Sequence, residues 1–170
     1  MKAASDNLVP VTLELGGKSP VIVDENADLS DVAKKVMRGK TMNAGQICLA
    51  PDYLMLPKGK SEEFAKASNE AISEMFADLK YNEDYTSVIN ERHYERINEL
   101  VSDAKEKGAE VIQINPADED FEQQELHKIP PTLVLNPTDE MKIMQEEIFG
   151  PVLPVKEYED FDETVNYLSL

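Results

Sequence analysis

Short apolar runs alternate with longer amphipathic stretches along most of this 170-residue chain. The apolar runs have the length of buried strands, and the stretches between them carry apolar residues at the spacing of a helix. Strands that alternate with helices pair in parallel through right-handed crossovers. The pattern therefore predicts an α/β fold, a three-layer domain with a mostly parallel sheet flanked by helices.

The expected strands share a high content of branched apolar residues and cover 20–23, 53–56, 110–114, 132–135 and 152–155. The expected helices share an apolar stripe. They run from the N-cap Asp28 to near Gly39, over 64–79, from Asn90 to a left-handed cap at Gly108, and over 161–168.

A single domain is expected, because a chain of this length can form one core but not two ordinary ones. Its 34 acidic and 17 basic residues give a net charge of −17, which would repel nucleic acid and anionic membranes. No stretch approaches the ~20 apolar residues of a membrane span. One cysteine cannot form an internal disulfide, so the cytoplasm is the expected compartment.

That cysteine, Cys48, lies in the small-residue loop NAGQICLAPDY, residues 43–53. A lone cysteine is most often a small buried apolar residue. A loop between a helical and an apolar segment is, however, also where a nucleophilic thiol can sit. Two further segments bear on the choice: VTLELGGKSP at 11–20 and EEIFGP at 146–151.

Together, and in this order, these segments resemble the signature blocks of the aldehyde dehydrogenase superfamily. The resemblance covers essentially the whole chain, and 50–53 and 130–133 are most similar to the coniferyl and fatty aldehyde dehydrogenase branch. It implies oxidation of an aromatic or long-chain aldehyde to a carboxylic acid, with NAD or NADP, through a cysteine thiohemiacetal and thioester. It also implies a homodimer for the full-length parent.

In this chemistry Cys48 would supply the attacking thiolate, and its backbone amide would donate to the oxyanion. Gly45 would allow a close backbone approach. Glu14 stands in an apolar run, a setting that suits a carboxylate acting as proton acceptor. Pattern alone favours a polar position on a half-exposed strand for Glu14, whereas the resemblance makes Glu14 the general base.

The resemblance also assigns a cofactor site. It implies that Glu147 holds the nicotinamide ribose, that Phe149 packs near the nicotinamide, and that Leu15 and Gly16 belong to the same site. Without the resemblance, Glu147 would be a solvated helix residue and Phe149 a core residue.

Two other readings of the polar residues are excluded. A phosphate-binding loop ending in Gly17-Lys18-Ser19 would need a glycine at position 12, where Thr12 stands, so Lys18 is expected to pair with backbone or an acid near the turn. His93 and His127 are isolated from other ligand-type residues, and no metal site is expected.

Members of the superfamily also carry a Rossmann-type dinucleotide-binding domain, an oxyanion-hole asparagine and an oligomerisation segment. None is recognised here, so residues 1–170 are expected to be a single thiol-bearing catalytic domain, truncated at both ends. It would be inactive alone, with the cofactor held mainly by the absent domain.

Two alternatives stay open. One is a cofactor-independent cysteine thioesterase or hydrolase, which lacks a convincing histidine partner. The other is a non-enzymatic acidic interaction domain in which Cys48 is inert.

Overall fold

A five-stranded sheet forms the centre of the computed structural model, which describes every residue except 123, 169 and 170. The strands are β1 (Pro20–Ile22), β2 (Tyr53–Pro57), β3 (Glu110–Gln113), β4 (Thr132–Leu135) and β5 (Val152–Tyr158). Their order is β1-β2-β5-β4-β3, and all neighbours are parallel except β3 and β4. The mostly parallel α/β fold is thereby confirmed.

The expectation of parallel pairing was wrong for β3. The segment 114–131 that joins β3 to β4 contains no helix among its described residues. A parallel return needs a long crossover connection, usually helical, whereas a loop can lead directly back into an antiparallel neighbour.

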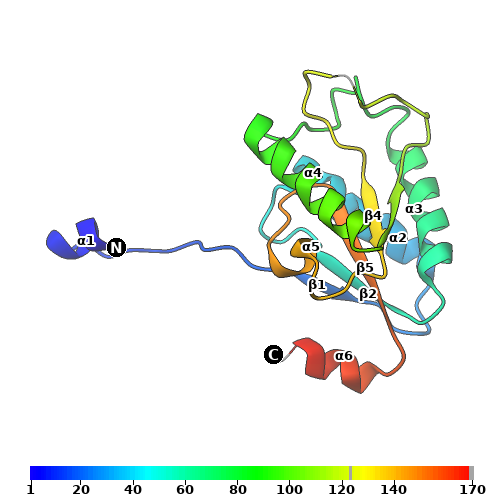
Figure 1. Cartoon of the computed structure of the whole chain (residues 1–170), viewed down its shortest axis with the longest axis horizontal. Coiled ribbons are helices and arrows are strands. Elements are labelled where there is room, and N and C mark those ends of the chain that lie inside the picture. The colour runs from blue at the N-terminus through cyan, green and yellow to red at the C-terminus, as the bar shows by residue number, and fades with distance from the viewer. Residues whose placement is uncertain (123, 169–170) are drawn as a thin grey trace.

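Helices cover both faces of the sheet (Figure 1). The helical elements are α1 (Lys2–Asp6), α2 (Leu29–Thr41), the 3₁₀ turn η1 (Met42–Gly45), α3 (Ser61–Met75), α4 (Glu91–Glu106), α5 (Lys142–Gln145) and α6 (Phe161–Leu168). One apolar cluster joins α2 and α3 to Leu54 and Leu56 of β2. A second cluster joins α4 and α5 to Tyr53 and Met55 of the same strand, as alternation along a strand requires.

Two helix ends differ from the predicted ones. Helix α2 continues past Gly39 to Thr41, and α3 ends at Met75 because Phe76 takes an extended conformation (φ −136°, ψ 124°). Leu79 is buried as the apolar pattern required, but from the loop that follows the helix. The N-cap of α2 is confirmed, since a carboxylate oxygen of Asp28 accepts hydrogen bonds from the next turn.

The N-terminal arm, residues 1–17, extends away from the body of the molecule and carries α1 at its far end (Figure 1). Residues 9–19 form neither helix nor strand. The arm exposes a row of large apolar side chains, Leu8, Val9, Val11, Leu13 and Leu15. The strand pattern of this segment is therefore not realised in the described chain.

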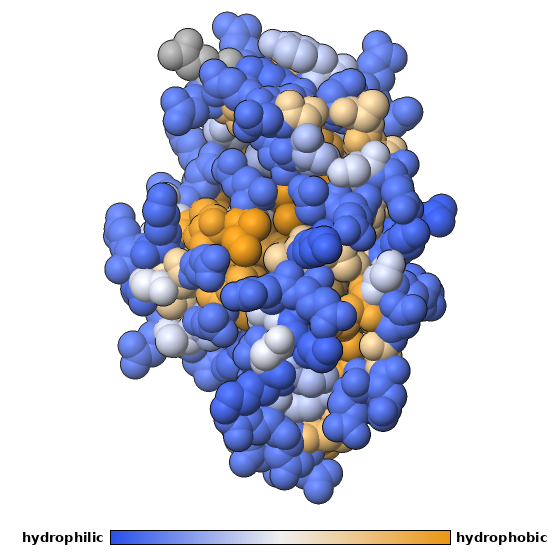
Figure 2. Space-filling view, turned by 90° about the vertical axis from the view of Figure 1, so that its right-hand side faces the viewer, coloured by the Kyte–Doolittle hydropathy of each residue, from blue (hydrophilic) through white to orange (hydrophobic). Residues whose placement is uncertain are grey.

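One face of the molecule is drawn by hydropathy in Figure 2. Hydrophilic residues predominate on it and surround a central group of apolar residues. Within the described part of the chain, no helix has the length and apolarity needed to cross a membrane.

Candidate active site

The motif segments meet at one edge of the sheet. The segment ending at Ser19 leads into β1, the Cys48 loop leads into β2, and residues 146–151 lead into β5. These strands are parallel neighbours in the order β1-β2-β5. The segments therefore lie next to one another at the amino-terminal ends of the strands.

Cys48 is exposed, in a turn of the chain that lies at the amino-terminal ends of these strands. The backbone before it is left-handed at Asn43, Ala44 and Gly45 (φ 50°, 52° and 71°), a conformation costly for residues other than glycine. The Ser19 hydroxyl donates to the Cys48 carbonyl oxygen at 3.3 Å. The cysteine loop is thus tied to the segment that precedes β1.

The close approach expected at Gly45 is present. An added Cβ atom there would lie 2.4 Å from the Gly150 carbonyl oxygen. Only a glycine lets the cysteine loop and the segment before β5 pack backbone to backbone.

Replacing Gly45 with alanine is expected to destabilise the fold by at least about 2 kcal/mol, through left-handed strain plus displacement of the backbone of Gly150. Chemical denaturation measures this loss. Gly59 is the matched control, because it also has positive φ (78°) but has no atom within 4 Å of an added Cβ. Equal losses for Gly45→Ala and Gly59→Ala would show that the close contact contributes nothing.

The expected cofactor residues are partly brought together. Gly16 has φ 89°, and a Cβ atom added to it would lie 2.5 Å from Oε2 of Glu147. Phe149 is 40% exposed rather than packed in the core. Arg96 of α4 fixes this segment, since its guanidinium donates to the carbonyl oxygens of Glu147 (3.3 Å) and Ile148.

Glu14 and Leu15 are placed differently. Both are exposed on the arm. In the described structure no hydrogen bond or ion pair joins the Glu14 carboxylate to the Cys48 loop. The apolar surroundings expected for Glu14 are not formed by the described residues.

The expected structural role of Lys18 is confirmed. Its ammonium group forms an ion pair with Asp52 and donates to the carbonyl oxygens of Ile143 and Glu146, both at 2.9 Å. Lys18 therefore links the segment before β1 to the segments before β2 and β5.

A second lysine, Lys40, lies beneath the cysteine loop and is 1% exposed. Its Nζ atom donates to the Pro51 carbonyl oxygen at 2.7 Å. Burial lowers the pKa of this ammonium from 10.5 to about 8; Asp52 opposes that shift and Lys18 adds to it. The cysteine loop is thus held by an ammonium group whose charged form is disfavoured by burial.

Stability should consequently rise with pH above 8. Between pH 8 and 10.5 the unfolded chain holds the Lys40 proton more tightly than the folded chain, so deprotonation favours folding. The gain is on the order of 3 kcal/mol at most. Urea denaturation across this range should show a smaller rise for Lys40→Met than for Lys35→Met, a matched change at an exposed residue of α2. If the free energy of unfolding rose equally with pH in the two variants, Lys40 would not be the origin of the rise.

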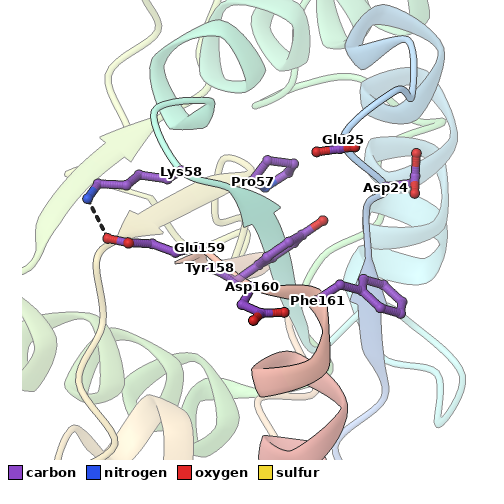
Figure 3. A pocket seen from close by; sticks show the side chains of 8 residues that line it. All are labelled: Asp24, Glu25, Pro57, Lys58, Tyr158, Glu159, Asp160 and Phe161. Carbon is purple, nitrogen blue, oxygen red and sulfur yellow. Dashed lines mark hydrogen bonds and ion pairs between the residues drawn. The ribbon is translucent and has the colours of Figure 1, made fainter.

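A cleft lies at the opposite, carboxyl-terminal ends of β1, β2 and β5 (Figure 3). It is lined by Asp24, Glu25, Pro57, Lys58, Tyr158, Glu159, Asp160 and Phe161, and Lys58 pairs with Glu159. Ligands of parallel sheets usually bind at the carboxyl ends of the strands. In this chain the conspicuous sequence motifs stand at the other edge.

Sequence reasoning missed Asp52, Lys40 and Arg96. Lys40 and Arg96 did carry a signal, because each is a basic residue beside the apolar stripe of its helix. Asp52 stands directly before an apolar strand, where a carboxylate needs a partner. The identity of the partners depends on segments distant in the sequence.

The Aldehyde dehydrogenase family model matches residues 1–168. The chain is 60% identical over 169 residues to a protein of Caulobacter vibrioides named "Probable coniferyl aldehyde dehydrogenase", and 52% identical to the "Coniferyl aldehyde dehydrogenase" of Pseudomonas sp. strain HR199. Each match covers 99% of this chain and 35% of the relative. The chain thus spans about a third of the length of these curated relatives.

A solved structure shares the fold. The substrate-bound state of Staphylococcus aureus AldH superposes with a TM-score of 0.85 at 36% identity, over 99% of this chain and 35% of that one. The family model, the relatives and the fold agree: the chain belongs to the aldehyde dehydrogenase family.

Proposed function

We propose that this chain is the thiol-bearing catalytic domain of an enzyme that oxidises an aldehyde to a carboxylic acid with a nicotinamide cofactor. The supporting observation is the convergence of the Cys48 loop, Gly16 and Glu147 at one edge of the sheet in a member of this family. The relatives named coniferyl aldehyde dehydrogenase favour an aromatic aldehyde as substrate.

In the proposed reaction the Cys48 thiolate attacks the aldehyde carbon, and the Cys48 amide donates to the oxygen that becomes negative. A nicotinamide bound here would supply the hydride acceptor that oxidation of the thiohemiacetal to a thioester requires. Glu14 then removes a proton from the water that hydrolyses the thioester, which releases the acid and regenerates the thiol.

The residues present fit a nicotinamide nucleotide. The Glu147 carboxylate lies against the Gly16 backbone, where it can accept hydrogen bonds from ribose hydroxyls. Phe149 is 40% exposed, so its ring can contact a bound nicotinamide. A related structure, a mutant of AldC from Pseudomonas syringae, holds NAD⁺ and octanal, at a TM-score of 0.79 and 27% identity over 96% of this chain.

The exposure of Glu14 and of the apolar side chains of the arm supports the presence of a further domain that packs against them. We infer that a dinucleotide-binding domain of the parent covers the arm, encloses Glu14 and completes the cofactor site. The chain by itself would then bind the cofactor weakly and lack dehydrogenase activity.

The test is NADH or NADPH formation from aromatic and long-chain aldehydes by this chain and by its longer parent, each with a Cys48→Ala counterpart. Activity of the parent that disappears in Cys48→Ala, with none from the isolated chain, is the expected result. Activity of the isolated chain would refute the proposal that a further domain completes the cofactor site. Ester hydrolysis by the parent without cofactor, and no aldehyde oxidation, would favour the thioesterase alternative.

A further inference from the structure

The ion pair of Lys18 and Asp52 sits where the segments before β1, β2 and β5 meet. All three N–H donors of Lys18 have acceptors: the Asp52 carboxylate and the carbonyl oxygens of Ile143 and Glu146. The other carboxylate oxygen of Asp52, Oδ1, accepts the Ile148 amide hydrogen at 3.0 Å. One pair of side chains therefore fastens together segments that are far apart in the sequence.

Backbone contacts extend the same junction. The Asp52 amide donates to the Ser19 carbonyl oxygen at 2.8 Å, and the Ser19 hydroxyl donates to the Cys48 carbonyl oxygen. The segment before β1 is thus bonded both to Cys48 itself and to Asp52, the residue directly before β2.

This pair differs from the ion pairs of the surface. The Lys18 and Asp52 side chains are 19% and 6% exposed, whereas those of Lys35 and Asp31 on α2 are 75% and 60% exposed. An exposed pair contributes little and tolerates many geometries. A buried pair is favourable only when its remaining donors and acceptors are satisfied, and here every N–H of Lys18 and both carboxylate oxygens of Asp52 have partners.

The pair also lies close in sequence to every group that the proposed reaction uses. Those groups are Glu14 before Lys18, Cys48 before Asp52, and Glu147 and Phe149 on either side of Ile148. None of them is bonded by the pair directly. The pair holds the backbone on either side of Glu147 and the end of the loop that carries Cys48, whereas Glu14 lies four residues before Lys18 on the exposed arm.

We propose that Lys18 and Asp52 are positioning residues that set the distance between the thiol of the Cys48 loop and the cofactor carboxylate of Glu147. This inference rests on the proposed function. The pair touches no reacting atom, and its effect passes through the backbone of the three segments. A misplacement of about 1 Å at a reacting group can cost roughly 10²-fold in rate.

The test uses the longer parent enzyme with NAD⁺ and coniferyl aldehyde, and compares Lys18→Met, Lys18→Arg and the control Lys35→Met, each well below its unfolding midpoint. Lys18→Met should lower kcat about 10²-fold and change KM less than about threefold. Lys18→Arg keeps the positive charge but replaces the compact ammonium group with a planar guanidinium. Its kcat should therefore lie between that of Lys18→Met and that of wild type. Lys35→Met should match wild type.

Amide hydrogen exchange on this chain gives a second readout that needs no activity. Lys18→Met should speed exchange in 48–52 and 143–150 and leave α3 unchanged.

Equal kcat for Lys18→Met and Lys35→Met would overturn the inference, and so would a uniform rise in exchange across the core. No Cys48-dependent oxidation by the wild-type parent would instead overturn the proposed function, and this inference with it.

Discussion

Replacing Cys48 with alanine or serine should lower aldehyde oxidation by the parent enzyme at least about 10⁴-fold, because in the proposed mechanism the Cys48 sulfur forms the covalent intermediate. Cys48 is the only cysteine of the chain, and its side chain is exposed. The substitution should therefore leave folding unaffected. Steady-state NADH formation measures the loss, and a denaturation curve checks the fold.

Ser19→Ala is a suitable companion to this variant. It removes only the hydroxyl that donates to the Cys48 carbonyl oxygen, so it tests the support of the loop without removing the thiol. A Cys48→Ala enzyme that retained substantial activity would exclude Cys48 as nucleophile.

Replacing Glu14 with glutamine should lower steady-state turnover by about 10² to 10⁴-fold while sparing thioester formation. Glutamine keeps the size and polarity of the side chain but cannot take the proton from water. Stopped-flow measurement of the longer parent should show a burst of about one NADH per active site, followed by slow turnover. Glu62→Gln, at an exposed residue of α3, is the control and should behave as wild type.

A Glu14→Gln enzyme with unchanged turnover would remove Glu14 from the reaction. Loss of the burst as well would place Glu14 in the earlier, thiol-activating step instead.

Much of the fold could be predicted because it depends on local pattern. The apolar runs gave the sheet strands, and Asp28 marked the start of α2 through its capping bonds. The antiparallel β3 and the early end of α3 could not be predicted in the same way. They depend on a helix-free connection and on how Leu79 packs from a loop, and neither leaves a local periodicity.

The same distinction applies to the site: features that depend on local sequence were predictable, and contacts between distant segments were not. Gly45 was expected to allow a close approach, and Gly150 is the group that it meets. The acid that partners Lys18 was not predictable, because Asp52 reaches it only through the pairing of β1 with β2. The surroundings of Glu14 did not follow from the apolar run around it, because Glu14 and the apolar residues of its arm are exposed in the structure.

The most direct test of a covalent mechanism at Cys48 is mass spectrometry of the Glu14→Gln parent, quenched during reaction with coniferyl aldehyde and NAD⁺. Because hydrolysis should be slow in this variant, an acyl group should accumulate, and peptide mapping should place it on the peptide that contains Cys48. Turnover that continues without any adduct on that peptide, or an adduct on a different residue, would contradict the account.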